Sequence, residues 1–181
     1  MSTTKVKSAR ERIIDVAGPL FYREGYRAVG VDRVIAEASV AKATFYKHFP
    51  AKDDLIVAWI EKAETYMNSN LPPADGPAPL FAYVDHMIDV AHQPRCKGCT
   101  YQGSAAEFKN EAHPAHAAAI KNKNRTLAEL ELRAKNQKAK HPRKTAELVH
   151  LLLEGVWASV QMFGRDAPIS HAKEAVRRLF D

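Results

Sequence analysis

The chain has 181 residues, of which 46% are hydrophobic, and a formal net charge of +6 at pH 7. This length and apolar content suffice for one hydrophobic core or two small ones, and they exclude intrinsic disorder and a collagen-like fibre. No apolar run reaches the roughly 18 residues that cross a bilayer, and the first residues, MSTTKVKSARER, lack the apolar stretch of a signal peptide. We therefore expect a cytoplasmic protein without a membrane partner, and the two cysteines fit a reducing compartment.

Hydrophobic periodicity divides the chain into helices, and no segment alternates like a convincing strand. Pro19 lies inside the first helix and is expected to kink it, because a proline removes one backbone hydrogen bond. The expected helices cover residues 8–25, 31–38, 42–48, 52–70, 77–93, 104–112, 114–140, 143–163 and 168–180. The sequence thus predicts an all-α fold.

The clearest linker is LPPADGPAP, residues 71–79, because prolines and a glycine interrupt any regular element there. We place the domain boundary in it. An N-terminal domain is expected over residues 6–66 and a second helical domain over residues 71–181.

The two short helices over residues 31–38 and 42–48 are separated only by Ser39, Val40 and Ala41. A three-residue turn between short helices forces a steep crossing angle, which is the helix-turn-helix arrangement. Pro50 then ends the second helix, since the residue before a proline is pushed out of the helical conformation. The sequence therefore predicts a helix-turn-helix with a recognition helix at about 42–48.

Aromatic rings and cations are crowded into the stretch AKATFYKHFPAKDDL, residues 41–55. Phe45 and Phe49 are four residues apart and share one helix face, so we expect them to anchor the helix to the core. The remaining face is expected to meet a DNA groove, because hydroxyl and ammonium groups are common phosphate ligands. Its candidate DNA contacts are Lys42, Ala43, Thr44, Tyr46, Lys47, His48 and Lys52, with the backbone amides at Gly30 and Val31 as a further phosphate site.

Residues 8–60 resemble the DNA-binding domain of the TetR family of transcriptional regulators. The family pattern, T-V-x-x-I-A-x-x-A-G-V-S-K-G-T-L-Y-x-H-F-x-S-K, is similar to GVDRVIAEASVAKATFYKHFPAKDDL here. The resemblance implies the same DNA contacts at Gly30 and Val31, at Lys42 to His48 apart from Phe45, and at Lys52. It also implies a helical second domain that binds a small-molecule effector and forms a homodimer.

Three positions depart from the family pattern, and two of the carried-over contacts have plain structural alternatives. Gly30 replaces the usual threonine cap, so a side-chain cap bond is lost there. Ser39 replaces a turn glycine, which costs on the order of 1 kcal/mol if its backbone is left-handed. Ala43 replaces a glycine near the start of the recognition helix. His48 can equally cap its helix, and Lys52 can be a solvated lysine.

The helix expected over residues 143–163 carries too many apolar residues for a single stripe, so it needs two packing partners. The last helix can supply one partner and a second subunit the other; a deeply buried helix of a monomer is the alternative. The candidate dimer interface comprises Leu152, Val156, Trp157, Val160, Phe163, Val176, Leu179 and Phe180. A two-fold dimer predicts a near-palindromic operator.

The stretch CKGCTYQGSAAEFKNEAHPAHA, residues 96–117, resembles a segment from one branch of the family, which reads approximately G-C-x-F-x-N-A-A-A-E-F. The resemblance implies that Cys99, Tyr101, Glu107 and Phe108 line the effector pocket. Ordinary core packing is the alternative for each of them. The sequence does not identify the effector.

Cys96 and Cys99, followed by His113 and His116, also invite a zinc site, but the H-x2-H spacing is shorter than usual. A redox switch through the two thiols is a further alternative, because Arg95 and Lys97 lie beside them. Structural thiols are the favoured interpretation, with no metal and no cofactor.

The basic segment, residues 121–144, holds nine Lys or Arg and two Asp or Glu, an excess that is larger than the net charge of the whole chain. Overall basicity is therefore no argument for DNA binding, which has to rest on local placement. We expect a solvated helix face here, with Leu127, Leu130 and Ala134 packing inward; an anionic ligand or partner is the alternative.

The resulting prediction is a ligand-responsive, dimeric DNA-binding regulator that acts as a repressor. The rival hypothesis is a thiol or metal-dependent enzyme that uses Cys96 and Cys99 with His113 and His116. No H-E-x-x-H, phosphate-binding loop or G-x-S-x-G motif supports the enzyme.

Overall fold

The structure is a computed structural model that describes residues 7–180. Within that range the chain is all-α, with short 3-10 turns at Gly164–Asp166 and Arg178–Phe180 and no strand. Residues 6 and 181, which bound the two expected domains, lie outside the described residues. The helices are α1 (Ala9–Glu24), α2 (Val31–Glu37), α3 (Lys42–His48), α4 (Lys52–Ser69), α5 (Pro79–Ala91), α6 (Thr100–Glu107), α7 (Pro114–Asn136), α8 (Pro142–Phe163) and α9 (Ala172–Arg177).

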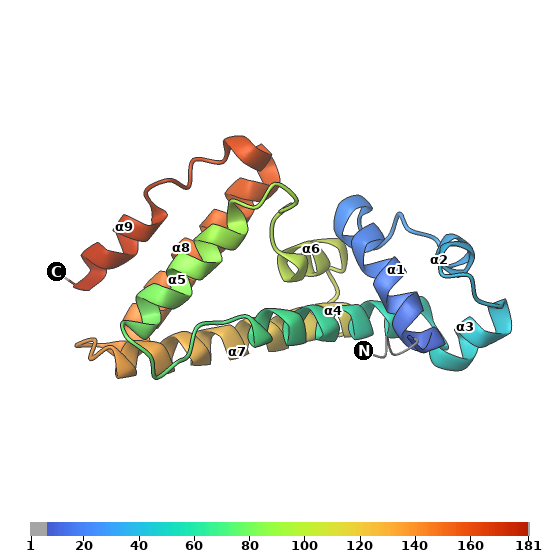
Figure 1. Ribbon diagram of the computed structural model, residues 1–181, viewed down its shortest axis with the longest axis horizontal. Helices are drawn as coiled ribbons and strands as arrows, with labels where there is room; N and C mark the ends of the chain where they lie inside the picture. The colour runs from blue at the N-terminus through green and yellow to red at the C-terminus, as the bar shows by residue number, and fades with distance from the viewer. Residues whose placement is uncertain (1–6, 181) are drawn as a thin grey trace, which may run out of the picture.

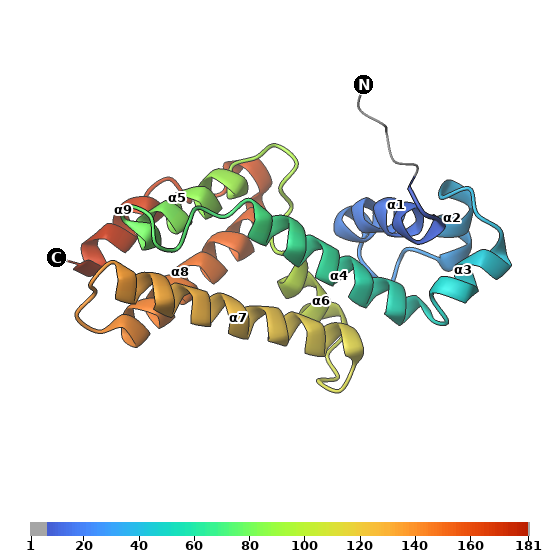
Figure 2. The ribbon, with the colours of Figure 1, turned by 60° about the horizontal axis from the view of Figure 1, so that its bottom comes forward.

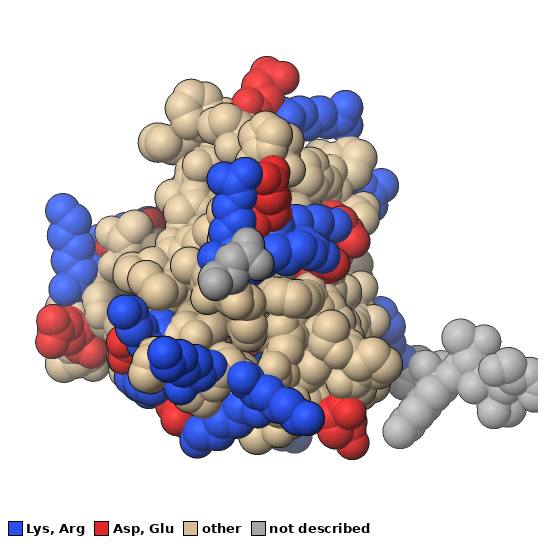
Figure 3. Space-filling view, turned by 90° about the vertical axis from the view of Figure 1, so that its left-hand side faces the viewer, with Lys and Arg blue, Asp and Glu red and all other residues tan. Residues whose placement is uncertain are grey.

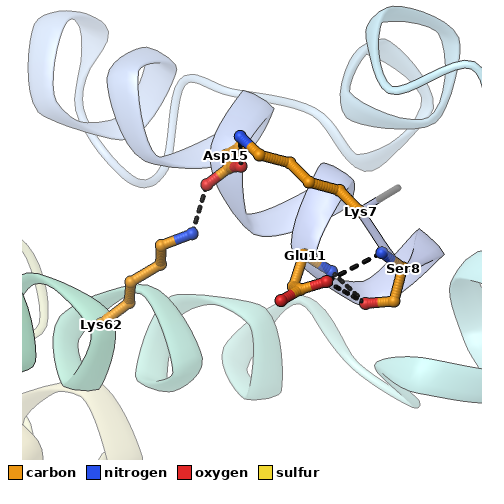
Figure 4. Close-up of polar contacts among 5 residues, drawn as sticks. All are labelled: Lys7, Ser8, Glu11, Asp15 and Lys62. Atoms are coloured by element: carbon orange, nitrogen blue, oxygen red, sulfur yellow. Dashed lines mark hydrogen bonds and ion pairs between the residues drawn. The ribbon is translucent and has the colours of Figure 1, made fainter. Parts of the chain in front are cut away.

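Helices α1, α2 and α3 form a small bundle at one end of an elongated molecule, and α4 leads from it into the body (Figure 1). Helix α1 begins at a capping box, in which Ser8 and Glu11 satisfy each other's backbone amides. It is held to α4 by Asp15, which accepts hydrogen bonds from Lys62 and from Lys7 (Figure 4). Pro19 lies inside α1, and the helix continues through it to Glu24.

The core of the N-terminal bundle includes residues from outside α1 to α4. It is built from apolar residues of α1 to α4, but Phe108 and Ala115 also belong to it, and both are almost completely buried. Phe108 directly follows α6 and Ala115 lies in the first turn of α7, 29 and 36 positions beyond the end of the linker at residue 79. The bundle therefore does not close its core without a contribution from the second half of the chain.

Helices α5, α7, α8 and α9 enclose a second core, which contains Leu80, Leu130, Val149 and Val176. In two views α5 and α8 run beside each other, and α7 spans the length of the body (Figures 1 and 2). The linker before α5 is held down by Arg133, whose side chain is 2% exposed. Its guanidinium donates to the carbonyl oxygens of Pro72 and Pro79 and pairs with Glu129.

Two of the expected helices differ from the structure. The helix expected over 104–112 covers Thr100–Glu107 instead, because Gly98 at φ 99° turns the chain and Cys99 takes the N-cap position. The last helix was expected over 168–180, but α9 begins only at Ala172. Ile169 is buried in the second core before the helix starts, so it anchors a turn rather than a helical stripe.

The basic segment differs from a simple solvated face. Leu130 and Ala134 are fully buried and Leu127 is half-buried, as expected, but Arg133 is buried with them. The turn between α7 and α8 forms the end of the body that lies farthest from α3, and Lys and Arg side chains gather along the lower edge of that end (Figures 1 and 3). This part of the segment is thus remote from the expected DNA contacts. In the range 7–180, no helix is both long enough and apolar enough to cross a membrane.

Candidate nucleic-acid interface and effector site

The expected helix-turn-helix is present, with α2 ending at Glu37 and α3 beginning at Lys42. Ser39 lies in the turn at φ 52°, the left-handed conformation in which a glycine would be less strained. Gly30 caps α2 in an extended conformation without a side-chain hydrogen bond. The two departures from the family pattern therefore have the structural consequences that the sequence predicted.

Helix α3 is fixed by its two phenylalanine rings. Phe45 is 0% exposed and Phe49 is 1% exposed, and their ring centroids lie 5.9 Å apart. A seven-residue helix is too short to be stable in water alone, so this anchoring is what holds it in place. Because side chains three and four apart share a face, burying this pair leaves the opposite face of α3 in solvent.

The candidate DNA contacts lie on or beside this outer face. Tyr46 is 43% exposed. Its ring packs edge-on against that of Phe45, with the ring centroids 5.3 Å apart, and this contact holds Tyr46 in position. Lys42 lies at the start of α3, and its ammonium is 3.4 Å from Asp32 of α2, so the two helices are bridged at the surface. Of the remaining candidates, Gly30, Ala43 and Lys47 are exposed, and Val31, Thr44 and His48 are partly exposed.

Lys52 differs from the other cations, because its ammonium donates to the backbone carbonyl of Arg27 at 3.3 Å. Partial burial lowers its pKa. Lys52 therefore ties the start of α4 to the loop before α2, and it is not simply solvated. A cation that the sequence argument missed is Arg10 of α1, whose guanidinium lies 5.3 Å over the Phe49 ring. The role of Phe49 could be predicted from its spacing to Phe45, whereas its contact with Arg10 of α1 could not be predicted from the sequence.

A polar cluster lies inside the second domain, and we call it the inner cluster: Cys99, Tyr101, Gln102, Lys123 and Glu154. The Lys123 ammonium donates to Glu154 at 2.5 Å and to the Cys99 thiol at 3.3 Å, and it lies 5.8 Å from the centre of the Tyr101 ring. Both charged side chains are largely buried, with 18% of Lys123 and 25% of Glu154 exposed.

The Tyr101 hydroxyl is buried in the inner cluster and has no hydrogen-bond partner. Burial raises the pKa of Tyr101, and the neighbouring Glu64 and Cys99 raise it further. The hydroxyl therefore stays protonated and remains a free donor. A buried donor without a partner costs about 1–3 kcal/mol, so it marks a place where a ligand atom would be favourable.

Helix α6 and the residues at its start connect the inner cluster to the N-terminal bundle through hydrogen bonds. Tyr22 donates to the carbonyl oxygen of Gly98 at 2.9 Å, and Tyr26 donates to that of Thr100 at 3.0 Å. At the other end of α6, Glu107 accepts from the backbone amides of Tyr26 and Arg27. Both ends of α6 are thus fastened to the last turn of α1 or to the segment that follows it.

Comparisons with known proteins agree with this geometry. The profile of "Bacterial regulatory proteins, tetR family" matches residues 13–59. The structure of a TetR-family transcriptional regulator from Streptomyces coelicolor is 29% identical, covers 95% of this chain and 94% of that chain, and superposes with a TM-score of 0.83. The chain belongs to the TetR family of transcriptional regulators. Its all-helical fold with an N-terminal helix-turn-helix is that of the family.

Two curated proteins are similar to this chain over a smaller part of their own length than the Streptomyces structure is. The TetC protein of transposon Tn10 in Escherichia coli is 29% identical over 87 residues, which are 46% of this chain and 44% of TetC. The transcriptional regulator UidR of Escherichia coli strain K12 is 25% identical over 129 residues, 70% of this chain and 64% of UidR. The chain therefore spans less than two thirds of the length of these relatives in the matched regions.

Membership of the TetR family decides against the enzyme hypothesis, because the family consists of transcriptional regulators. The two cysteines and two histidines of the enzyme hypothesis each contact a different residue. The Cys96 thiol lies 3.7 Å from the Tyr22 hydroxyl, whereas Cys99 contacts Lys123. His116 bonds the carbonyl of Phe108, and His113 lies 3.2 Å from Asp53. Among the described residues, no group of three or more His, Cys, Asp or Glu is placed to hold a metal ion.

The four residues expected to line a TetR effector pocket fall into two places. Cys99 and Tyr101 belong to the inner cluster, whereas Glu107 and Phe108 lie at the junction with the DNA-binding bundle. Phe108 is 6% exposed and stacks on His113 at 4.1 Å. An open groove of about 810 Å³ runs along the outer face of α7, and none of the four residues lines it.

The expected dimer residues divide by helix face. Val156, Val160 and Val176 are 0–5% exposed and fill the core of the single chain, so they do not offer a surface to a partner. Leu152, Trp157 and Phe180 are half-buried against the same core, and Phe163 and Leu179 are exposed. The residues predicted to form the dimer interface on α8 therefore lie largely on the face that packs against the core of the same chain. The outward face carries Leu148, Leu151, Gly155, Ala158 and Met162, all of them exposed.

Proposed function

We propose that the protein is a sequence-specific DNA-binding regulator, a repressor that a small-molecule effector releases from its operator. The observation that carries this proposal is the orientation of α3, with Phe45 and Phe49 buried and Tyr46 and Lys47 in solvent. A recognition helix needs a rigid anchor on one side and free polar groups on the other, which contact phosphates and base edges. Family membership supports the same activity.

We propose that two copies pair through the outward face of α8. Leu148, Leu151, Gly155, Ala158 and Met162 follow one another at intervals of three and four residues, so they form one helical stripe. Leu151 and Met162 are 67% and 72% exposed. Gly155 and Ala158 lie between them, so a second helix can approach closely. A two-fold dimer would present two copies of α3, which suits a near-palindromic operator.

The effector would bind at the inner cluster, where Tyr101 offers a free donor. Because α6 is bonded to the DNA-binding bundle at both ends, a ligand that moves α6 also moves the bundle. The effector acts only through its differential affinity for the DNA-bound and released arrangements.

The test is DNA binding by the purified chain, with operator sequences selected from a random duplex library and affinities measured by fluorescence anisotropy. Lys47→Ala is expected to weaken binding to all selected sequences, because it removes a phosphate contact. It should also reduce the slope of log affinity against log salt concentration by about one. Lys140→Ala is the matched control, since this exposed lysine lies in the turn between α7 and α8.

The control separates local placement from total charge, because both variants remove one positive charge. Equal losses for Lys47→Ala and Lys140→Ala would mean that the protein binds DNA through its overall charge and that α3 is not the recognition helix. Salt-insensitive binding, or no selected sequence at all, would also contradict the proposal.

A further inference from the structure

The start of α1 lies beside the recognition helix α3, and Arg10 contacts the end of that helix (Figures 1 and 2). The Arg10 guanidinium lies 5.3 Å over the ring of Phe49, the residue that follows the last turn of α3. Phe49 is 1% exposed, so its ring is a rigid support. A cation over an aromatic face is attracted by the negative charge of that face, which fixes the guanidinium relative to α3.

Arg10 differs from neighbouring cations because its charge has no carboxylate partner. Lys7 pairs with Asp15, and Arg33 pairs with Glu24. In the part of the chain that the structure describes, the Arg10 side chain forms no ion pair and donates no hydrogen bond. It is also exposed to solvent. The five N–H donors of its guanidinium therefore remain available to an anion.

Covering Phe49 does not by itself require an arginine. An apolar side chain would shield the ring from water equally well, whereas an arginine adds a planar fork of donors that can bind two phosphate oxygens at once. Because the ring already fixes the guanidinium, less side-chain entropy is lost when an anion binds. The chemistry of Arg10 thus suits a phosphate contact beside α3.

Lys42 and Arg10 lie at opposite ends of α3. Lys42 is the first residue of the helix, and Arg10 covers the residue that follows the last one. A helix of seven residues is about 10 Å long, and the major groove of B-DNA is about 12 Å wide. A helix of this length in that groove has a phosphate backbone near each of its ends. The two cations can therefore contact phosphates on both sides of the groove.

We infer that Arg10 is a DNA-contacting residue, whose guanidinium, supported by the Phe49 ring, binds a backbone phosphate at the edge of the operator half-site. The inference rests on the proposed DNA-binding function and extends the DNA surface to α1. The contact reads no base, because phosphates are the same in every sequence. It fixes the position and orientation of α3 in the groove.

The contact is tested on the full chain with the operator selected above. Arg10→Met keeps an apolar cover on the Phe49 ring and removes the charge. We expect its affinity to fall about tenfold, and the slope of log affinity against log salt concentration to fall by about one. Arg10→Lys should keep the wild-type slope but lose part of the affinity, since a lysine lacks the planar fork.

Arg12→Met is the matched control, because it removes the same charge from the same helix. Arg12 is also exposed, and it lies roughly 200° around α1 from Arg10. We expect it to leave both the affinity and the salt slope close to those of wild type. A thermal melt establishes that each variant is folded.

Operator duplexes in which one phosphate at a time is replaced by a neutral methylphosphonate locate the contact. In wild type, neutralising one linkage at the edge of a half-site should weaken binding. In Arg10→Met, the same duplex should bind as well as the unmodified one does. Loss of sensitivity at a single linkage is a signature that a purely structural role of Arg10 would not produce.

Three results would overturn the inference. They are equal losses in Arg10→Met and Arg12→Met, a lower melting temperature with an unchanged salt slope in Arg10→Met, and identical methylphosphonate profiles for Arg10→Met and wild type. In each of these cases, operator binding by wild type and its loss in Lys47→Ala would still support the proposed function. Failure of wild type to bind any selected sequence would instead refute the proposed function, and the Arg10 contact with it.

Discussion

The carboxylate of Glu107 accepts a hydrogen bond from the backbone amide of Tyr26 at 2.9 Å, across 81 positions of sequence. It accepts a second from the neighbouring amide of Arg27 at 2.8 Å. Gly25 lies so close that its built Cβ would be 3.0 Å from the same carboxylate. The last residue of α6 thus satisfies two amides in the turn that follows α1.

Replacing Glu107 with alanine is expected to lower the free energy of unfolding by about 2 kcal/mol, since hydrogen bonds to a charged group contribute roughly that much. Glu107→Gln, which keeps one acceptor oxygen, should lower the free energy of unfolding by less. Urea denaturation measures both. Because the contact joins α6 to the bundle, we also expect Glu107→Ala to weaken DNA release by a bound effector; unchanged stability and release would show that the contact is incidental.

Arg133→Met should lower the free energy of unfolding by about 3 kcal/mol. The substitution leaves the carbonyls of Pro72 and Pro79 without their donor and the half-buried Glu129 without its partner. Arg143→Met is the matched control, because Arg143 is exposed and its ion pairs lie at the surface. The two variants are compared by urea denaturation; similar small losses would mean that Arg133 does not hold the linker.

Gly98→Ala and Gly103→Ala are expected to change stability in opposite directions. Gly98 has φ 99° and its Cβ would meet Gln161 and the Trp157 carbonyl, so alanine should cost about 2 kcal/mol. Gly103 lies inside α6, where a Cβ meets nothing within 4 Å. Alanine there should stabilise the protein by about 0.5–1 kcal/mol, because it is the better helix former. Thermal melts of the pair distinguish the two, and a stabilising Gly98→Ala would contradict the packing described.

The contacts of Asp15 predict a loss of stability in acid (Figure 4). Partial burial opposes ionisation, but hydrogen bonds from Lys62 and Lys7 outweigh it and lower the pKa of Asp15 below its ordinary value of 3.8. A carboxyl with a lower pKa in the folded state stabilises the fold above its unfolded pKa, and this contribution is lost as the pH falls through the folded value.

Asp15→Asn should therefore be less stable than wild type at neutral pH, and the difference should disappear as the pH falls below 3.8 towards the lowered pKa. Urea midpoints measured across this range check the expectation. The loss should be smaller than that for Arg133→Met, since Lys7 and Lys62 are largely exposed. A difference that persists in strong acid would mean that the effect does not come from ionisation.

Leu151→Glu and Met162→Glu are expected to convert the proposed dimer to monomers, because each places a charge within the apolar stripe of α8. Leu132→Glu is the control, since Leu132 is a similarly exposed leucine on α7. Analytical ultracentrifugation measures the assembly state. A dimer that survives both substitutions would place the interface elsewhere.

The sequence predicted the recognition helix well because the signal was local. Phe45 and Phe49 are four residues apart, so their shared face and their burial follow from helix geometry alone. Ser39 in a left-handed turn and Gly30 without a side-chain cap also follow from neighbours in the chain. These features depend on a few consecutive residues.

The sequence by itself determined the all-helical class and the outward polar face of α3, because spacing along one helix decides which side chains share a side. Only the tertiary structure decided which side of α8 faces the core, since Val156 and Leu151 are both apolar and the choice depends on where α5 and α9 pack. It also decided that Lys123 and Arg133, in a segment that reads as a solvated face, turn inward to Glu154 and to the linker carbonyls. Their partners lie tens of residues away, and long-range pairing leaves no periodic trace in the sequence.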